Sequence, residues 1–435
     1  MFEIIYYICA MKTAIIGAGA AGCFCATILK RLCPEVQIDV YESGQKPLQK
    51  VAITGGGRCN LTNSFAEVKS LNQVYPRGYN LMKRLFKQFD NKSTMQWFEN
   101  EGVKLTVQED QCVFPQSQNA MEIVSTLLRG MQGTRIFCDQ RVREVEPCLS
   151  SSTNDETIGN KNYKYRINTD SRSEIYDFVV VTTGGSPKSS GLSFLESLDL
   201  EIVEPVPSLF TFNIGNEKGR QAITELMGVV VEQAEAGLAG TKYKSEGPLL
   251  ITHWGMSGPA ILKLSSHAAR WLAEKDYQAT LCVNWLGGMK EDKIREMLQQ
   301  AIAENSKKQI GTIHPITQRL WHYLLNKLEI APDRRCAELG AKQINKLAAT
   351  LSNDNYTISG QSRFKEEFVT CGGVSLSNID TNTLECKKHP GIYFAGEILD
   401  VDAITGGFNL QAAWTMGYVV AQSIHAKKLI NPIDN

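Results

Sequence analysis

The sequence predicts an α/β protein whose parallel sheet is built from both ends of the chain, with a module of different character inserted between them. Three observations indicate this fold class. A strand, a glycine turn, a helix and a second strand follow one another over residues 12–42. A buried strand, a loop and a helix close the chain over residues 391–426, whereas residues 195–371 mix short β-like runs with strongly helical segments.

The N-terminal pattern is typical of a dinucleotide-binding unit. Its elements are an apolar strand at 12–16, a helix at 23–32 and a second strand at 36–41 that ends on Glu42. In the turn between strand and helix, Gly17 permits a sharp change of direction and Gly19 lets the backbone approach a pyrophosphate. Gly22 allows the helix to pack closely on the strand.

The chemistry of this unit favours an unphosphorylated adenosine. The start of the helix offers N–H groups and a partial positive charge to phosphates. Glu42 can accept hydrogen bonds from a ribose and would repel a 2′-phosphate, so the site suits FAD or NAD. The alternative is a glycine-rich turn in some other βαβ unit. The cofactor-binding residues predicted here are Gly17, Gly19, Ala20, Ala21, Gly22 and Glu42.

A second glycine-rich segment over residues 54–63 predicts an irregular loop that reaches the middle of the cofactor. Three successive glycines suit a backbone that lies against a flat or anionic ligand. Arg58 can neutralise a phosphate or hold a substrate carboxylate by a two-point contact, and it is a tentative catalytic residue. Cys59 either lies near the cofactor or is structural. The cofactor-binding residues predicted here are Gly56, Gly57, Arg58, Cys59 and Asn60.

Two further strand ends favour FAD over NAD, because a long cofactor must be held at both ends. A strand at 178–181 and a strand at 391–397 each end on glycine, and a helix follows the second from about Asn409. The positive end of that helix would raise the potential of a flavin beside it. Alternatively, Glu397 and Asp400 are helix-capping or surface acids. The residues predicted to bind the cofactor here are Thr183, Gly184, Gly396, Glu397, Asp402, Thr405, Gly406, Gly407, Phe408 and Asn409.

The inserted module contributes one candidate catalytic residue. His253 stands on an irregular turn before Pro259, and Pro259 fits the first turn of a helix reaching residue 272. His253 is either a proton donor to the substrate or a hydrogen-bonded turn residue. Further helices are expected at 291–305, 316–328 and 334–351. The domain division expected is 11–194 and 372–435 for the cofactor domain, 195–288 for a β-rich domain and 289–355 for a helical subdomain.

Composition narrows the functional classes. Lys plus Arg equals Asp plus Glu at 46 each, which argues against a large nucleic-acid surface. The 12 cysteines include no Cys-x-x-Cys pair, so we expect small core residues in a reducing compartment and no metal site.

No segment is apolar enough to span a membrane, and a cytoplasmic protein is expected. Residues 1–10 are expected to precede a natural start at Met11 or to form an extension, and residues 150–162 to form an exposed loop.

Four blocks of the sequence together resemble the BaiN-like (YhiN-like) flavoproteins, from about Met11 to about Gln422. They are the Gly17–Gly22 turn, the run at 55–63, the run at 253–260, and the residues at 393–411 that include Tyr393-Phe-Ala-Gly-Glu397 and Thr405-Gly-Gly-Phe-Asn-Leu-Gln411. The resemblance implies a discontinuous Rossmann-like FAD-binding domain of the glutathione-reductase type, an inserted β-rich domain and a small helical domain. It also implies FAD-dependent oxidoreductase activity with NADH or NADPH as a transient electron donor.

The leading hypothesis is a reductase of an electron-poor, enone-type C=C bond in a small organic substrate. One branch of the family that the chain resembles is linked to reduction of such bonds in bile-acid intermediates. The alternatives are a flavin oxidase or monooxygenase, a tRNA-associated flavoprotein, and a non-catalytic protein stabilised by FAD. No nucleic-acid partner is expected, and the sequence predicts no oligomeric state.

Overall fold

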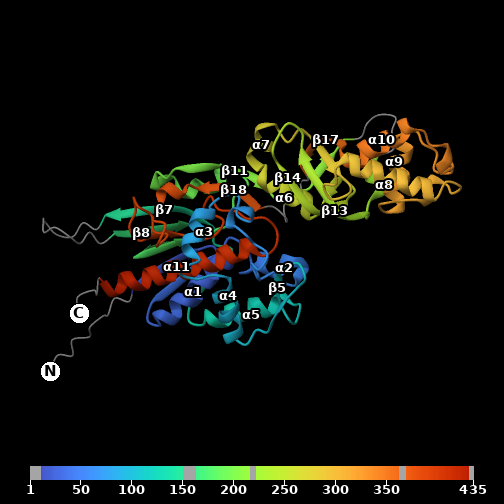
Figure 1. Cartoon of the computed structure of the whole chain (residues 1–435). Helices are drawn as coiled ribbons and strands as arrows, with labels where there is room; N and C mark the ends of the chain where they lie inside the picture. Colours follow the sequence, from blue (N-terminus) through green and yellow to red (C-terminus); the bar gives the residue numbers. More distant parts are fainter. Residues whose placement is uncertain (1–10, 150–162, 216–221, 362–368, 431–435) are drawn as a thin grey trace, which may run out of the picture. The chain divides into compact units, whose positions relative to one another are not determined.

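The computed structural model describes residues 11–149, 163–215, 222–361 and 369–430 (Figure 1). The chain forms two compact units, the first from Met1–Val206 with Thr370–Asn435 and the second from Pro207–Val369. The expected N-terminal extension at 1–10 and the expected loop at 150–162 lie outside the described residues. The predicted subdivision of the insert into β-rich and helical domains remains a proposal.

The first unit is organised around a parallel sheet of five strands. In spatial order the strands are β19 (Ile392–Phe394), β10 (Phe178–Val181), β1 (Lys12–Ile16), β2 (Gln37–Tyr41) and β6 (Arg135–Phe137). Ile16 pairs with Val181, and Val181 pairs with Phe394, so the strand ends are aligned at one edge. The C-terminal strand therefore completes the N-terminal sheet, and the predicted α/β fold class is confirmed.

Two helices from opposite ends of the chain run side by side on this sheet, α1 (Ala20–Leu32) and α11 (Phe408–Ile430), as Figure 1 shows. Both are longer than predicted, because α1 begins directly after Gly19 and α11 continues to residue 430. A Cβ atom added to Gly417 would lie 2.7 Å from the Ala21 carbonyl oxygen, so glycine permits this close helix crossing.

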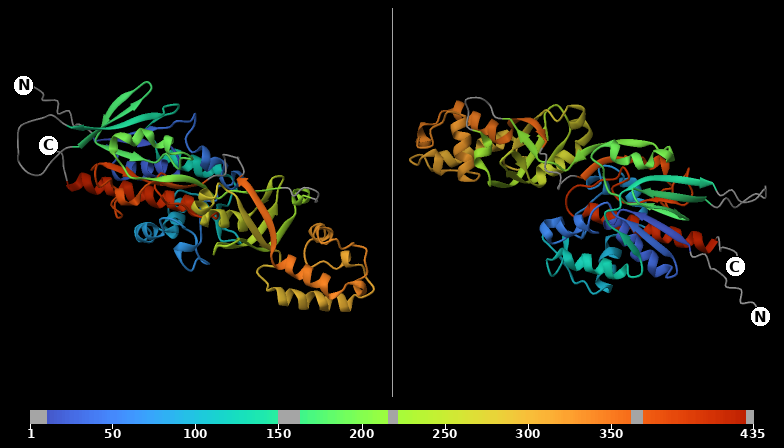
Figure 2. Two further views of the ribbon diagram at one scale, coloured as in Figure 1. Left: turned by 90° about the horizontal axis from the view of Figure 1, so that it is seen from above. Right: turned by 180° about the vertical axis from the view of Figure 1, so that it is seen from behind.

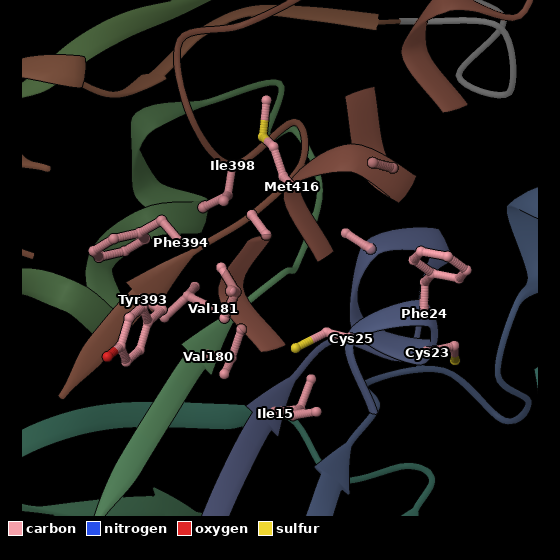
Figure 3. Close-up of a cluster of buried hydrophobic side chains, with 14 of the residues drawn as sticks. Ile15, Cys23, Phe24, Cys25, Val180, Val181, Tyr393, Phe394, Ile398 and Met416 are labelled. Carbon is pink, nitrogen blue, oxygen red and sulfur yellow. The ribbon is translucent and has the colours of Figure 1, made fainter. Parts of the chain in front are cut away.

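The core between helix α1 and the strands explains the cysteines at the start of that helix (Figure 3). Cys23 and Cys25 are fully buried, and Cys25 points toward Ile15 and Val180. Burial raises the pKa of the Cys25 thiol to about 12, because the thiolate would lose its hydration. Every cysteine in the described part of the chain is a free thiol.

Smaller elements surround the sheet. The helices are α2 (Gln49–Gly57), α3 (Tyr79–Leu85), α4 (Asn91–Asn100) and α5 (Ala120–Gly130). Three small sheets accompany them. The first consists of β3 (Thr62–Asn63), β5 (Cys112–Pro115) and β4 (Leu105–Val107), and the second of β7 (Val142–Leu149), β8 (Tyr163–Thr169) and β9 (Ser173–Tyr176). The third pairs β11 (Ile202–Ser208) with β18 (Val369–Val374).

The second unit is a closed barrel with helices attached (Figure 2). The barrel strands are, in order, β12 (Phe212–Ile214), β15 (Gly255–Ser257), β14 (Lys244–Ile251), β13 (Val230–Leu238), β16 (Ala279–Asn284) and β17 (Asp354–Gln361). The helices are α6 (Pro259–His267), α7 (Ala269–Glu274), α8 (Glu291–Glu304), α9 (Gln318–Lys327) and α10 (Ala341–Ser352).

Two helix predictions in this unit need correction. The helix expected from Pro259 to residue 272 is interrupted at Ala268, which separates α6 from α7. The helix expected from residue 334 begins only at Ala341, because residues 334–337 instead pair with the neighbouring backbone segment 306–310.

Candidate functional site

The Gly17–Gly22 turn lies at the aligned strand ends and is held by backbone packing. The Gly17 N–H donates to the Tyr41 carbonyl at 2.7 Å, and its φ of +104° lies in the left-handed region. A Cβ on Gly17 would lie 2.6 Å from the Thr182 carbonyl oxygen, and one on Gly22 would lie 2.5 Å from Thr182 Oγ1. Any larger residue at either position would force strand β10 away from the turn.

Gly19 differs from its two neighbours because it faces open space. A Cβ added there would meet no heavy atom within 4 Å, and no side chain caps the helix N-terminus at this residue. An uncapped helix start beside open space suits an anion such as a pyrophosphate. This geometry fits the adenosine diphosphate part of FAD.

Glu42 lies beside the same turn, at the end of β2. Its carboxylate accepts the Ala18 N–H at 2.9 Å through Oε2 and the Gly44 N–H at 2.7 Å through Oε1. The side chain is half-buried, so part of it is still accessible. Its position next to the glycine turn is the one that recognition of a ribose requires in a dinucleotide-binding unit.

The segment after α2 contains the irregular backbone that its glycines predict. The helix bounds run to Gly57, yet Thr54, Gly55 and Gly56 have non-helical dihedral angles. Arg58 is exposed, and its guanidinium lies over the Phe114 ring at 4.5 Å from the ring centroid. Its Nε donates to the Gly55 carbonyl at 3.1 Å. Its Nη1 donates to Gln118 Oε1 at 3.4 Å, so Arg58 is oriented while its exposed guanidinium remains accessible to an anion or a carbonyl oxygen.

Cys59 has the opposite environment to Arg58. It is fully buried, and desolvation raises the pKa of its thiol to about 12. A thiol in this state stays protonated near neutral pH and is a poor nucleophile. The surroundings favour the structural interpretation of Cys59 over a role in chemistry.

Two asparagines join this segment to the loop before α11. Asn63 Nδ2 donates to the Gly406 carbonyl at 3.1 Å. When the side-chain amide of Asn60 is oriented so that both its oxygen and its nitrogen have hydrogen-bond partners, the oxygen accepts the Gly407 N–H at 3.2 Å. A Cβ on Gly407 would lie 2.5 Å from the Thr62 carbonyl carbon, so the two backbones are in direct contact. Sequence blocks more than 300 residues apart therefore form one surface.

A buried polar network at the start of α11 was not predicted from the sequence. Gln411 is fully buried and accepts the Thr62 hydroxyl at 2.6 Å. It donates to Thr94 Oγ1 at 2.9 Å and to Thr415 Oγ1 at 3.0 Å. The Trp414 indole N–H adds a bond to the Leu61 carbonyl at 2.9 Å. These bonds fix the 60–63 backbone to the helix that carries the Gly406–Gly407 turn.

The second strand end also meets the C-terminal block. A Cβ on Gly184 would lie 4.0 Å from both Glu397 Oε2 and Lys50 Nζ. Glu397 Oε1 accepts the Thr370 N–H at 2.6 Å, and the Cβ position of Gly396 lies 3.2 Å from Ala21. Lys50 was missed in the sequence because an exposed lysine on a helix carries no local signal.

Asp402 and Asn409, two further predicted cofactor ligands, also have partners within the protein. Asp402 is buried and forms an ion pair with Arg77 in which both carboxylate oxygens take part, with Nε–Oδ1 at 2.5 Å. Burial opposes a charge on Arg77, but the contacts with Asp402 outweigh it and raise the pKa of the guanidinium. The Asn409 amide bonds the Ala403 N–H and carbonyl, each at 2.9 Å. Their roles toward FAD remain predictions.

His253 lies in the second unit, on the hairpin between β14 and β15. The Thr252 N–H donates to the Gly255 carbonyl at 2.8 Å, which places His253 and Trp254 at the tip. Both side chains are exposed, Trp254 to 52%. The proposed role of His253 as a proton donor remains a prediction.

Apart from His253, the predicted site residues lie in the first unit. Direct contacts link the Gly17–Gly22 turn to residues 182–184 and Gly396, and the 60–63 backbone to residues 406–407. The open helix start at Gly19, the adjacent Glu42 and the glycine-lined strand ends fit FAD.

Across the described ranges, no cluster of His, Cys, Asp and Glu is placed to hold a metal ion. In the same residues, no helix has both the length and the hydropathy needed to span a bilayer.

Comparisons with known proteins agree over nearly the whole chain. Residues 11–423 match the family described as HI0933-like protein Rossmann domain. Ribosomal RNA dihydrouridine synthase of Escherichia coli (strain K12) is 27% identical over 430 residues, covering 95% of this chain and 98% of that protein. The 3-dehydro-bile acid delta(4,6)-reductase of Clostridium scindens is 26% identical over 426 residues, with the same two coverages of 95% and 98%.

Solved structures with a similar arrangement include two enzymes. The 3-ketosteroid delta1-dehydrogenase of Sterolibacterium denitrificans aligns with a TM-score of 0.48 and 10% identity, covering 96% of this chain and 99% of that one. The E. coli quinol fumarate reductase subunit FrdA aligns with a TM-score of 0.48 and 13% identity, covering 98% and 71%.

Proposed function

The chain belongs to the HI0933-like family of Rossmann-domain flavoproteins and is a flavin-dependent oxidoreductase, and we propose that it reduces a C=C bond conjugated to a carbonyl group. NADH or NADPH is the proposed electron donor. The family resemblance expected from the four sequence blocks is confirmed. The identity of the substrate and of the donor belongs to the proposal.

The observation that carries the proposal is the chemistry shared by the full-length relatives. Formation of dihydrouridine saturates a ring C=C bond of uracil that is conjugated to a carbonyl group. A delta(4,6)-reductase acting on a 3-dehydro-bile acid saturates C=C bonds conjugated to a ketone. The two substrates differ in size and charge, but the reacting group is the same, and both names describe reductases.

The proposed roles follow from the site geometry. When bound, FAD supplies hydride-transfer chemistry. The open helix start at Gly19 would hold the pyrophosphate, and Glu42 would hold the ribose. Arg58, oriented by Phe114, would bind the carbonyl oxygen of the substrate and stabilise the negative charge that develops there. His253 or a water molecule would give the proton to the carbon next to the carbonyl.

The balanced charge of the sequence leads us to expect no nucleic-acid partner, but two of the relatives weaken that expectation. Two of the curated relatives are ribosomal RNA dihydrouridine synthases, the second from Haemophilus influenzae at 27% identity over 423 residues. The balanced net charge of the whole chain does not decide the question, because a local basic surface can bind RNA.

The first experiment is an absorbance spectrum of the purified protein, followed by anaerobic addition of NADH and then NADPH. Flavin bands near ~450 nm that bleach with either nucleotide and recover with a conjugated enone would support the proposal. A flavin that neither nucleotide bleaches would contradict the proposed donor. Rapid oxygen consumption that the enone does not suppress would favour an oxidase instead.

A further inference from the structure

The helical part of the second unit carries a local excess of positive charge. Residues 305–349 contain eight Lys or Arg and three Asp or Glu, a net charge of +5 in a chain whose total is zero. The rest of the protein is therefore net acidic. A charge asymmetry of this kind points to an anionic partner.

Three of these eight cations already serve the fold. Lys327 forms an ion pair with the buried Asp354 at 2.5 Å, and Arg334 contacts Glu338. Arg319 donates to the Glu225 carbonyl at 3.2 Å. These three are therefore committed to contacts within the unit.

The other five cations form what we call the basic face, namely Lys307, Lys308, Arg335, Lys342 and Lys346. All five are exposed, and none has an ion pair with any residue that the structure describes.

Backbone pairing brings three members of the basic face, Lys307, Lys308 and Arg335, together. The Cys336 N–H donates to the Lys308 carbonyl at 2.9 Å, and the Ile310 N–H donates to the Arg334 carbonyl at 2.9 Å. Arg335 pairs with Gln309 in the same ribbon. Helix α10 begins a few residues later, and Lys342 and Lys346 are one turn apart on its exposed side.

We propose that the basic face binds the sugar–phosphate backbone of RNA. Both the positive charge of the basic face and its lack of exposed apolar side chains favour RNA as the partner. Among the described residues, the exposed large hydrophobic side chains all lie outside 305–349. A membrane surface or a folded protein partner would call for apolar contacts beside the cations. Phosphate binding requires only charge and polar groups.

This inference goes beyond the proposed reductase chemistry, and RNA binding can be measured without any reductant. The test measures the fluorescence anisotropy of a labelled RNA stem–loop with the full-length, flavin-loaded protein over a range of salt concentrations. The variant is Lys307→Gln/Lys308→Gln/Arg335→Gln. The matched control, Lys104→Gln/Lys242→Gln/Lys275→Gln, removes three exposed lysines that lie outside the basic face.

The wild-type protein should bind RNA with an affinity that falls steeply with salt. The triple variant should lose at least about tenfold in affinity, and the slope of log K against log salt should fall by about 2, since each phosphate contact contributes about 0.7. The control should stay within about twofold of wild type, because it leaves the basic face intact.

Three results would overturn the inference: no RNA binding by the wild-type protein, equal losses in variant and control, or binding of phosphatidylserine vesicles through these residues with RNA binding unchanged. If the triple variant does not fold, Lys342→Glu/Lys346→Glu provides a second test on helix α10. Unchanged RNA binding in that variant would also contradict the inference. Failure of NADH and NADPH to bleach the flavin would count only against the reductase proposal.

Discussion

The Gly17–Gly22 turn and the hairpin at 252–255 are both tight turns with candidate functional residues, but they present different parts of the chain. In the first turn the backbone itself is the candidate binding surface, since Gly19 has no side chain and faces open space. In the hairpin the backbone is fixed by Thr252, whose hydroxyl accepts the Trp254 and Gly255 N–H groups at 3.3 and 3.2 Å. The hairpin tip presents two exposed side chains, the candidate proton donor His253 and Trp254.

This difference shows which kinds of candidate functional residue can be recognised from a sequence. Where close contacts leave no room for a side chain, only glycine is tolerated, and the spacing of such glycines can be recognised in the sequence. An exposed histidine leaves no such pattern, since nothing in the fold demands it. Substitution of Gly17 or Gly22 should therefore lower stability strongly, whereas substitution at the hairpin tip should affect only activity.

The largest loss of stability is expected for Asp402→Asn, which removes the buried carboxylate that pairs with the half-buried Arg77 guanidinium. Breaking a buried ion pair costs about 3–5 kcal/mol, and urea unfolding would measure it. The matched control is Asp170→Asn in the exposed pair with Arg143, which should unfold like wild type. If Asp402→Asn instead keeps its stability and loses FAD, Asp402 is the cofactor ligand that the sequence predicts.

Gly17→Ala should be the next most destabilising change, by about 3 kcal/mol. The methyl group would require a left-handed alanine and would collide with the Thr182 carbonyl, and these two costs add. Gly19→Ala is the comparison, because its methyl group meets nothing in the protein. It should keep wild-type stability in thermal unfolding and weaken FAD binding about tenfold. Equal behaviour of the two variants would show that the turn is not organised as described.

These two turns also show how far sequence reasoning reached. The alternation of strand, glycine turn and helix predicted the sheet and the positions of Gly17, Gly22 and Glu42, because the whole pattern lies within residues 12–42. The Arg77–Asp402 pair and the contact of Gly407 with Thr62 join residues more than 300 positions apart. Nothing local distinguishes such residues, so only the folded chain reveals them.

A smaller loss, about 2 kcal/mol, is expected for Gln411→Leu. The substitution leaves the buried hydroxyls of Thr62, Thr94 and Thr415 with fewer partners, and each unsatisfied group is costly. It should also weaken FAD binding, because the 60–63 backbone would keep the Trp414 bond to α11 but lose the Gln411 bond. Gln422→Leu is the control, since its amide bonds only the adjacent Tyr418 hydroxyl among the described residues. Flavin retention on gel filtration, with chemical unfolding, would separate the two effects.

The smallest effect on stability is expected for His253→Ala, within about 0.5 kcal/mol, because the side chain is exposed at the hairpin tip. Its effect on turnover should be large if His253 donates the proton, at least about 100-fold. Reduction of the flavin by the nicotinamide donor should not change, since that step precedes protonation of the substrate. Stopped-flow measurement of the two half-reactions would separate these steps. Unchanged turnover with His253→Ala would remove this residue from the mechanism and leave water as the donor.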